Sequence, residues 1–260
     1  MGAPAINFEQ ILVFIFVFLR IGAMLIMIPV FGEASVPLRV KGGLTILIAL
    51  LVSPSIHTDI TFLNTEGEII ALVIAMVGEI LIGIIIGFAA KIIFAGIQFA
   101  GDTIGVQMGF SIVNVLDPVS NAQISIISEF QYLVAVLVYL AIDAHHMFIY
   151  AIVDSYRTIP AFGYHFSASL MQSIITFSKG LFLTAIKVSA PIMAVLLFTN
   201  VALGVVARTV PQINIFAVGF PLQIAIGLFF FGLMIPLFVM LTQSTVAGLG
   251  IEIQTLLRLM

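Results

Sequence analysis

Six ionisable side chains lie inside long apolar stretches of the sequence, where an isolated charge is costly. They are Arg20, Glu79, Lys91, Glu129, Lys179 and Lys187. A charged side chain that faces lipid costs several kcal/mol, so we expect these groups to pair with one another or to face an aqueous interior. Because no dense series of Asp, Glu and His accompanies them, structural pairing is favoured over a proton relay.

Asp143 and the adjacent His145 and His146 carry the side-chain types that bind metal ions. Neighbouring residues on a helix point about 100° apart, and no further ligand is evident nearby, so a single ion is not easily shared. The sequence therefore favours a loop-anchoring or helix-starting role for the His pair, and we predict no metal.

The main classes of catalytic and cofactor motif are missing from the sequence. It contains no Gly-x-Ser-x-Gly nucleophile turn, no glycine-rich phosphate loop and no Cys. Nine Lys and Arg against 12 Asp and Glu give a net charge of -3 without a basic patch, which disfavours nucleic-acid binding. We expect no catalytic residues and no cofactor.

Glycines recur every four residues in two places, at Gly83 and Gly87 and again at Gly101, Gly105 and Gly109. This spacing puts bare positions on one face of a helix and lets another backbone approach closely. For Gly83, Gly87, Gly101 and Gly105 we predict helix packing.

After Gly109 the sequence no longer has the pattern of a membrane span, and the irregular stretch ends at Asp117-Pro118, a pair that favours a turn. Irregular backbone at membrane depth is tolerated only where protein buries it or it lines a cavity. The residues alone leave two alternatives open, a pore constriction or plug and an ordinary re-entrant turn. The candidate gating residues are Gln107, Met108, Gly109, Phe110, Ser111, Ile112, Val113 and Leu116.

The elements that must position these residues are membrane helices. Of the 260 residues, 62% are hydrophobic and 8% are charged, and the mean hydropathy is +1.29, which predicts an all-α membrane protein. The candidate spans are 8–29, 44–56 (extended by 38–43), 68–100, 124–142, 177–207 and 215–241. The first is expected to be a retained helix and not a cleaved signal.

The segments 68–100 and 177–207 are too long for a single bilayer crossing, which takes roughly 20 residues, so they must tilt, break or extend beyond the membrane. Pro191 is the expected break in the 177–207 segment. A polar connection is expected over 143–166, and a tight turn between the last two helices at Arg208, Pro211, Gln212 and Asn214. The basic residues at 39, 41 and 208 weakly predict that those ends are cytoplasmic.

An ordered set of motifs along nearly the whole chain resembles the FliR/SctT family of type III secretion export-gate proteins. The set is Gln107-Met108-Gly109-Phe110, Asp117-Pro118, His145-His146, the run from Pro211 to Phe216, and Val218 to Pro221. Ala144 departs from the pattern, since family members often have Gly before the His pair.

The resemblance implies one subunit of a right-handed helical gate in the bacterial inner membrane, within the flagellar basal body. Its partners would be FliP-like subunits in five copies, FliQ-like subunits in four copies, and FlhB-like and FlhA-like export proteins. The gate would export unfolded flagellar proteins. Residues 1–166 would form a FliP-like portion with the pore loop at 105–117, and 167–260 a FliQ-like hairpin with a C-terminal segment.

Three other functions fit the composition. The chain could serve a virulence injectisome instead of a flagellum, or be a secondary transporter or channel, or be a scaffold without a pore. A transporter would show inverted repeats and charges converging at one depth, and neither is convincing here.

Overall fold

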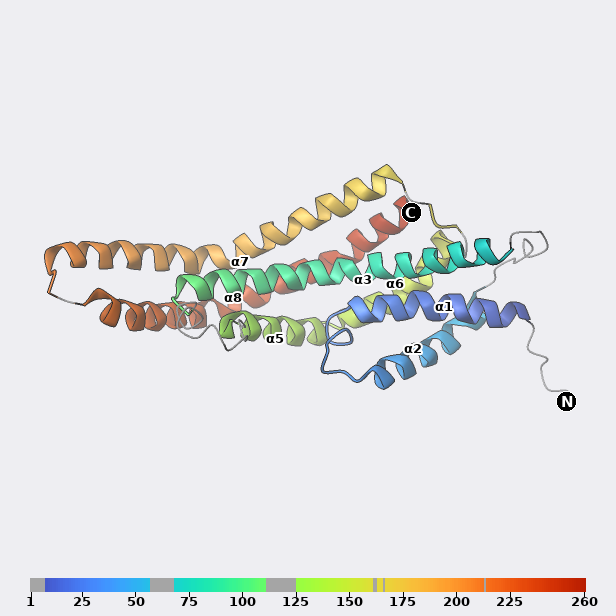
Figure 1. Cartoon of the computed structure of the whole chain (residues 1–260), viewed down its shortest axis with the longest axis horizontal. Helices are drawn as coiled ribbons and strands as arrows, with labels where there is room; N and C mark the ends of the chain where they lie inside the picture. Colours follow the sequence, from blue (N-terminus) through green and yellow to red (C-terminus); the bar gives the residue numbers. More distant parts are fainter. Residues whose placement is uncertain (1–7, 57–67, 111–124, 161–162, 166, 213) are drawn as a thin grey trace. The chain divides into compact units, whose positions relative to one another are not determined.

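The computed structural model describes residues 8–56, 68–110, 125–160, 163–165, 167–212 and 214–260, and throughout these ranges the regular structure is helical. The helices, labelled in Figure 1, are α1 (Phe8–Met27), α2 (Leu38–Val52), the short 3-10 helix η1 (Ser53–Ser55), α3 (Glu68–Gln107), α5 (Ile126–Ala141), α6 (Ala144–Thr158), α7 (Ala168–Thr209) and α8 (Ile215–Leu259). The prediction of an all-α protein is confirmed.

Within the described ranges, five helical segments are long and apolar enough to cross a membrane: α1, α3, α7, α8, and α2 taken together with η1. A sixth crossing results if α5 and α6, which are separated by a short break, count as one. At 40, 42 and 45 residues, α3, α7 and α8 are each about twice as long as a single crossing requires.

Three expectations about these elements were wrong. Helix α7 continues through Pro191 without ending there, because a proline removes only its own backbone donor and the remaining groups in an apolar helix have no other partners. The connection predicted at 143–166 contains α6. Helix α8 runs to Leu259, well beyond the predicted end at 241.

The chain forms two compact units, and both draw on distant parts of the sequence. Unit 1 comprises Met1–Lys91, Asp143–Phe177 and Ala247–Met260, and unit 2 comprises Ile92–Ile142 and Ser178–Val246. Each unit therefore takes residues from both of the portions, 1–166 and 167–260, that the family resemblance implies.

In unit 1, α1 and α2 lie side by side and are joined by a turn that covers residues 28–37 (Figure 1). The Lys41 ammonium group closes this turn by donating to the carbonyl oxygens of Gly32 at 3.0 Å and Glu33 at 2.8 Å. Leu12 and Phe16 of α1 pack with Ala75 of α3 in a buried apolar cluster.

The end of α8 is also tied into unit 1. The backbone N–H of His165 donates to the carbonyl of Met260 at 2.9 Å, and the Ser167 hydroxyl donates to the carbonyl of Leu259 at 2.8 Å. These bonds satisfy carbonyl groups that a helix end leaves without partners.

Unit 2 packs the second half of α3 against α5, α7 and α8. The Phe94 ring of α3 makes edge contacts with Tyr132 and Tyr139 of α5, with ring centroids 5.8 and 5.7 Å apart. Phe99 of α3 contacts Phe182 of α7 in the same way, at 6.0 Å. Such edge-to-face pairs stabilise beyond their buried area.

In unit 1, α1 and α3 approach each other closely at Gly83 and Gly87. A Cβ atom on Gly83 would overlap the Arg20 carbonyl oxygen and lie 2.9 Å from the Ala23 Cβ, and one on Gly87 would lie 2.8 Å from the Met24 carbonyl oxygen. Both glycines are therefore required for the backbones of α1 and α3 to touch.

We predict that Gly83→Ala lowers the free energy of unfolding by about 1–3 kcal/mol, because α1 must move away from α3 to admit the methyl group. The measurement is the unfolding transition of the detergent-purified protein. Gly180→Ala is the matched control, since nothing lies within 4 Å of its added Cβ, and it should be neutral or slightly stabilising. Equal effects of the two substitutions would contradict the proposed close packing.

Candidate functional site

Helix α3 ends in a glycine-dependent cap within unit 2, at the start of the predicted gating segment. The backbone N–H of Phe110 donates to the Gly105 carbonyl at 3.1 Å, and that of Gly109 donates to the Val106 carbonyl at 3.1 Å. Gly109 has a φ of 91°, in the left-handed region. These are the two hydrogen bonds and the left-handed residue of a Schellman motif, so Gly109 is the residue that stops α3.

Helix α8 covers this cap at two points. A Cβ on Gly109 would lie 2.8 Å from the Phe220 ring, and a Cβ on Gly227 would lie 2.7 Å from the Met108 side chain. Phe220 and Gly227 are seven residues apart and so lie on one face of α8. This face of α8 therefore packs against both Met108 and Gly109.

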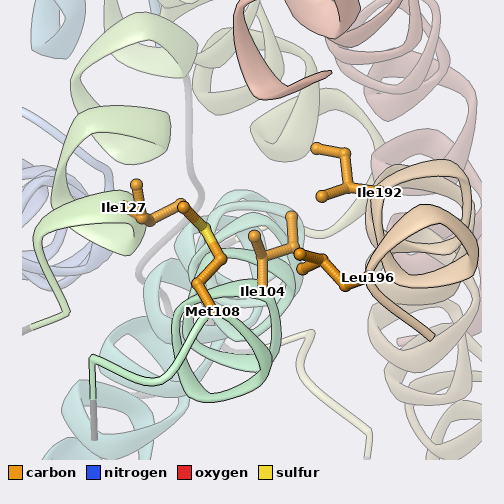
Figure 2. Close-up of a cluster of buried hydrophobic side chains, with 5 residues drawn as sticks. All are labelled: Ile104, Met108, Ile127, Ile192 and Leu196. Carbon is orange, nitrogen blue, oxygen red and sulfur yellow. The ribbon is translucent and has the colours of Figure 1, made fainter. Parts of the chain in front are cut away.

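Met108 is fully buried, in a cluster with Ile104 of α3, Ile127 of α5, and Ile192 and Leu196 of α7. Figure 2 shows its side chain beside Ile104 and extending toward Ile127, with the two α7 residues on the other side of Ile104. Phe110 is partly buried and packs against this cluster. Met108 is thus a core residue of unit 2, and a part for it in closing a pore stays a prediction.

Gly101 and Gly105 lie where α3 meets the first turn of α5. A Cβ on Gly101 would lie 2.9 Å from the Ser128 backbone nitrogen, and one on Gly105 would overlap the Ser125 hydroxyl. Ser125 caps α5 through the Ser128 N–H at 3.4 Å, and the Ser128 hydroxyl donates to the Gln98 carbonyl of α3 at 2.9 Å. The cap of α5 is therefore also its contact with α3.

The rest of the predicted gating segment, including Ser111, Ile112, Val113 and Leu116, lies outside the described residues. The structure shows how this segment begins: Gln107 and Gly109 are partly buried, and Met108 is enclosed by three other helices.

In unit 1, Arg20 and Glu79 form a buried ion pair. The Arg20 Nε donates to Glu79 Oε2 at 2.6 Å and Nη2 donates to Oε1 at 3.0 Å, while the side chains are 0% and 2% exposed. This two-point geometry matches the guanidinium to the carboxylate and is among the stronger charged interactions in proteins.

Helix α6 completes the surroundings of the pair. The Arg20 Nη1 donates to the Ser155 hydroxyl at 2.7 Å, and the Tyr156 hydroxyl donates to Glu79 Oε2 at 3.2 Å. The Arg20 guanidinium carbon lies 3.6 Å from the centroid of the Tyr156 ring, a cation–π contact. One buried charge pair thus joins α1, α3 and α6. Tyr156 was not among the predicted site residues, because residues 143–166 were expected to form a connection.

The other four charges of the apolar segments do not share this arrangement. Lys91, Glu129, Lys179 and Lys187 are all exposed, and within the described ranges none has an oppositely charged group at ion-pair distance. At the turn between α7 and α8, Arg208, Pro211, Gln212 and Asn214 are exposed, and the Asn214 carboxamide oxygen accepts from the Ala217 N–H at 3.3 Å.

Asp143, His145 and His146 lie together at the start of α6. Their ligand atoms all fall within 4.8 Å of one another, so the two His side chains do not diverge as their adjacent positions on a helix led us to expect. The left-handed backbone of Asp143, with a φ of 55°, precedes the first turn and places its carboxylate near the two rings.

We predict that Arg20→Met destabilises the protein by roughly 3–5 kcal/mol, because the substitution leaves the Glu79 carboxylate buried without a counter-charge. The double variant Arg20→Met/Glu79→Leu should be more stable than Arg20→Met alone, since it removes that charge. A double-mutant cycle on unfolding free energies tests this coupling. Lys187→Met, which removes an exposed charge, is the control. Additive effects of Arg20→Met and Glu79→Leu would contradict the coupling between these two residues.

Comparison with known proteins places this architecture in one family. Residues 11–249 match the family described as "Bacterial export proteins, family 1". The flagellar biosynthetic protein FliR of Pectobacterium carotovorum subsp. carotovorum is 33% identical over 224 residues, covering 86% of this chain and 84% of that protein. FliR of Bacillus subtilis (strain 168) is 35% identical over 226 residues, covering 82% of each chain. FliR of Escherichia coli (strain K12) is 32% identical over 220 residues, covering 84% of this chain and 82% of that protein. The chain therefore belongs to the bacterial export proteins, family 1, the family of the flagellar biosynthetic protein FliR.

Proposed function

We propose that this chain is a core subunit of the flagellar type III export gate, where it helps to form the pore through which unfolded flagellar proteins leave across the inner membrane. One copy assembles with five FliP-like and four FliQ-like subunits in the basal body and works with FlhB-like and FlhA-like export proteins. The three relatives described above bear flagellar names, which favours the flagellum over an injectisome.

The observation that carries this proposal is the end of α3. A helix that stops inside an apolar bundle exposes backbone groups, and such groups are tolerated only beside protein or a water-filled passage. Here the left-handed backbone of Gly109 ends the helix, and Phe220 and Gly227 of α8 pack against this end. The segment that follows therefore begins from a rigid base, as a pore-closing loop requires.

Within this arrangement we assign different parts to the predicted gating residues. Met108 and Phe110 hold the base of the loop through the buried cluster. Ser111, Ile112, Val113 and Leu116 form the closing portion, in which apolar side chains exclude water and small solutes from the resting pore. Gln107 and Gly109 set the point at which the chain leaves the helix.

The exposed surface of unit 2 supports a role among other subunits. Phe182 and Ile186 of α7 are 58% and 62% exposed, and Lys179 and Lys187 lie beside them on the same helix. Large apolar side chains that are this exposed need to be covered by lipid or by another protein. A lysine is costly against lipid, so its presence on this face favours cover by neighbouring subunits.

The two portions of the chain have separate parts in the proposal. Residues 1–166 carry the pore loop and correspond to a FliP-like subunit. The α7–α8 hairpin in 167–260 corresponds to a FliQ-like subunit. Its two helices are held together within unit 2 by a hydrogen bond from the Gln223 side-chain amide to the Asn200 side-chain oxygen Oδ1.

We predict that deletion of 111–116 makes the resting gate permeable to small solutes, because it removes the closing portion and leaves the buried base intact. The measurement is solute influx into cells or proteoliposomes that contain the complete gate. The wider deletion of 106–116, which covers the whole candidate loop, should also leak, although it removes the buried Met108 as well.

A deletion of equal length at 59–64, in another segment between helices, is the control and should not leak. Assembly is checked by the native mass of the purified complex, which should correspond to one copy of this chain with five and four copies of its partners. An unchanged influx through a fully assembled gate that lacks 111–116 would overturn the pore-loop assignment.

A further inference from the structure

The start of α6 carries a group of metal-binding side chains that the export function does not use. Asp143, His145 and His146 each offer a ligand atom, and these atoms lie within 4.8 Å of one another. The distance between His146 Nδ1 and Asp143 Oδ1 is 3.8 Å. The centroids of the two imidazole rings are 4.1 Å apart.

The Asp143 carboxylate is available for a ligand. An Asp before a helix usually accepts a hydrogen bond from the first turn, but this side chain makes no such cap. Its backbone carbonyl instead accepts from the His146 N–H at 3.0 Å, a bond within the first turn of α6. The carboxylate is 73% exposed and the His146 side chain 57% exposed, so an ion can reach them.

The separation of these donors suits a small transition-metal ion. For metal–ligand bonds of 2.0–2.2 Å, two donors on a tetrahedral zinc ion lie roughly 3.4 Å apart. The observed spacing, up to 4.8 Å, is larger than that value, and the exposed Asp143 and His146 side chains can rotate to shorten it. Two imidazole nitrogens and one carboxylate oxygen are a common zinc donor set, with a fourth position left for water.

We infer that Asp143, His145 and His146 form a binding site for a divalent transition-metal ion of the zinc class. A bound ion would hold together the first turn of α6, the helix that supplies Ser155 and Tyr156 to the buried Arg20 pair. The ion therefore has a structural role at the beginning of this helix.

Zinc titration by calorimetry tests the site, using the full-length protein purified in detergent without a histidine tag. The wild type should bind one Zn²⁺, and His146→Gln and Asp143→Asn should each weaken binding at least tenfold. Because binding only to the folded protein stabilises it, Zn²⁺ should also raise the unfolding temperature of the wild type and not that of the two variants.

His165→Gln is the matched control, since it removes an exposed imidazole of the same unit that lies outside the cluster. It should bind Zn²⁺ as the wild type does. Equal loss in His165→Gln and His146→Gln, or no binding by the wild type, would overturn the inference. Zinc X-ray absorption on the wild type provides a test without substitutions, in which two coordinated imidazoles are expected and fewer than two would contradict the site.

Discussion

The four-residue spacing of glycines on α3 is the constraint on which both units depend. In unit 1, Gly83 and Gly87 let the backbone of α1 touch α3, and in unit 2, Gly101 and Gly105 do the same for the first turn of α5. Gly109 continues the spacing, but its left-handed backbone ends the helix. Glycine thus allows other helices to pack closely along α3, and at its last occurrence in this spacing it also terminates the helix.

The buried pair of Arg20 and Glu79 gives unit 1 a specific arrangement that apolar contacts alone do not provide. Apolar side chains can slide past one another at small cost, whereas an uncompensated buried charge is strongly unfavourable. Because Ser155 and Tyr156 complete the hydrogen bonds and the cation–π contact, α6 must also take one position within the unit. In unit 2 the corresponding fixed point is apolar, with Met108 enclosed between α3, α5, α7 and α8.

The sequence predicts the apolar helices well because hydrophobic runs are local, but it does not predict the long-range pairs. Arg20 and Glu79 are 59 residues apart, and nothing local indicates that they meet. Helix α6 was missed because its polar residues resemble a connection, although Ala144, Phe148, Ile152 and Tyr156 recur every fourth residue and are all buried. The end of α3 at Gly109 could likewise have been predicted from the sequence, since glycine is the usual residue just after a helix end.

The central claim is that the segment after Gly109 lines the path of the exported chain. The sequence contains no Cys, so a single Ile112→Cys substitution gives one defined thiol for disulfide cross-linking to a cysteine in an export substrate stalled within the gate. We expect a cross-link at 112 and none from Leu133→Cys, on the exposed face of α5. If a gate that holds a stalled substrate cross-links equally well at both positions, or only at 133, the segment after Gly109 does not line the path of the exported chain.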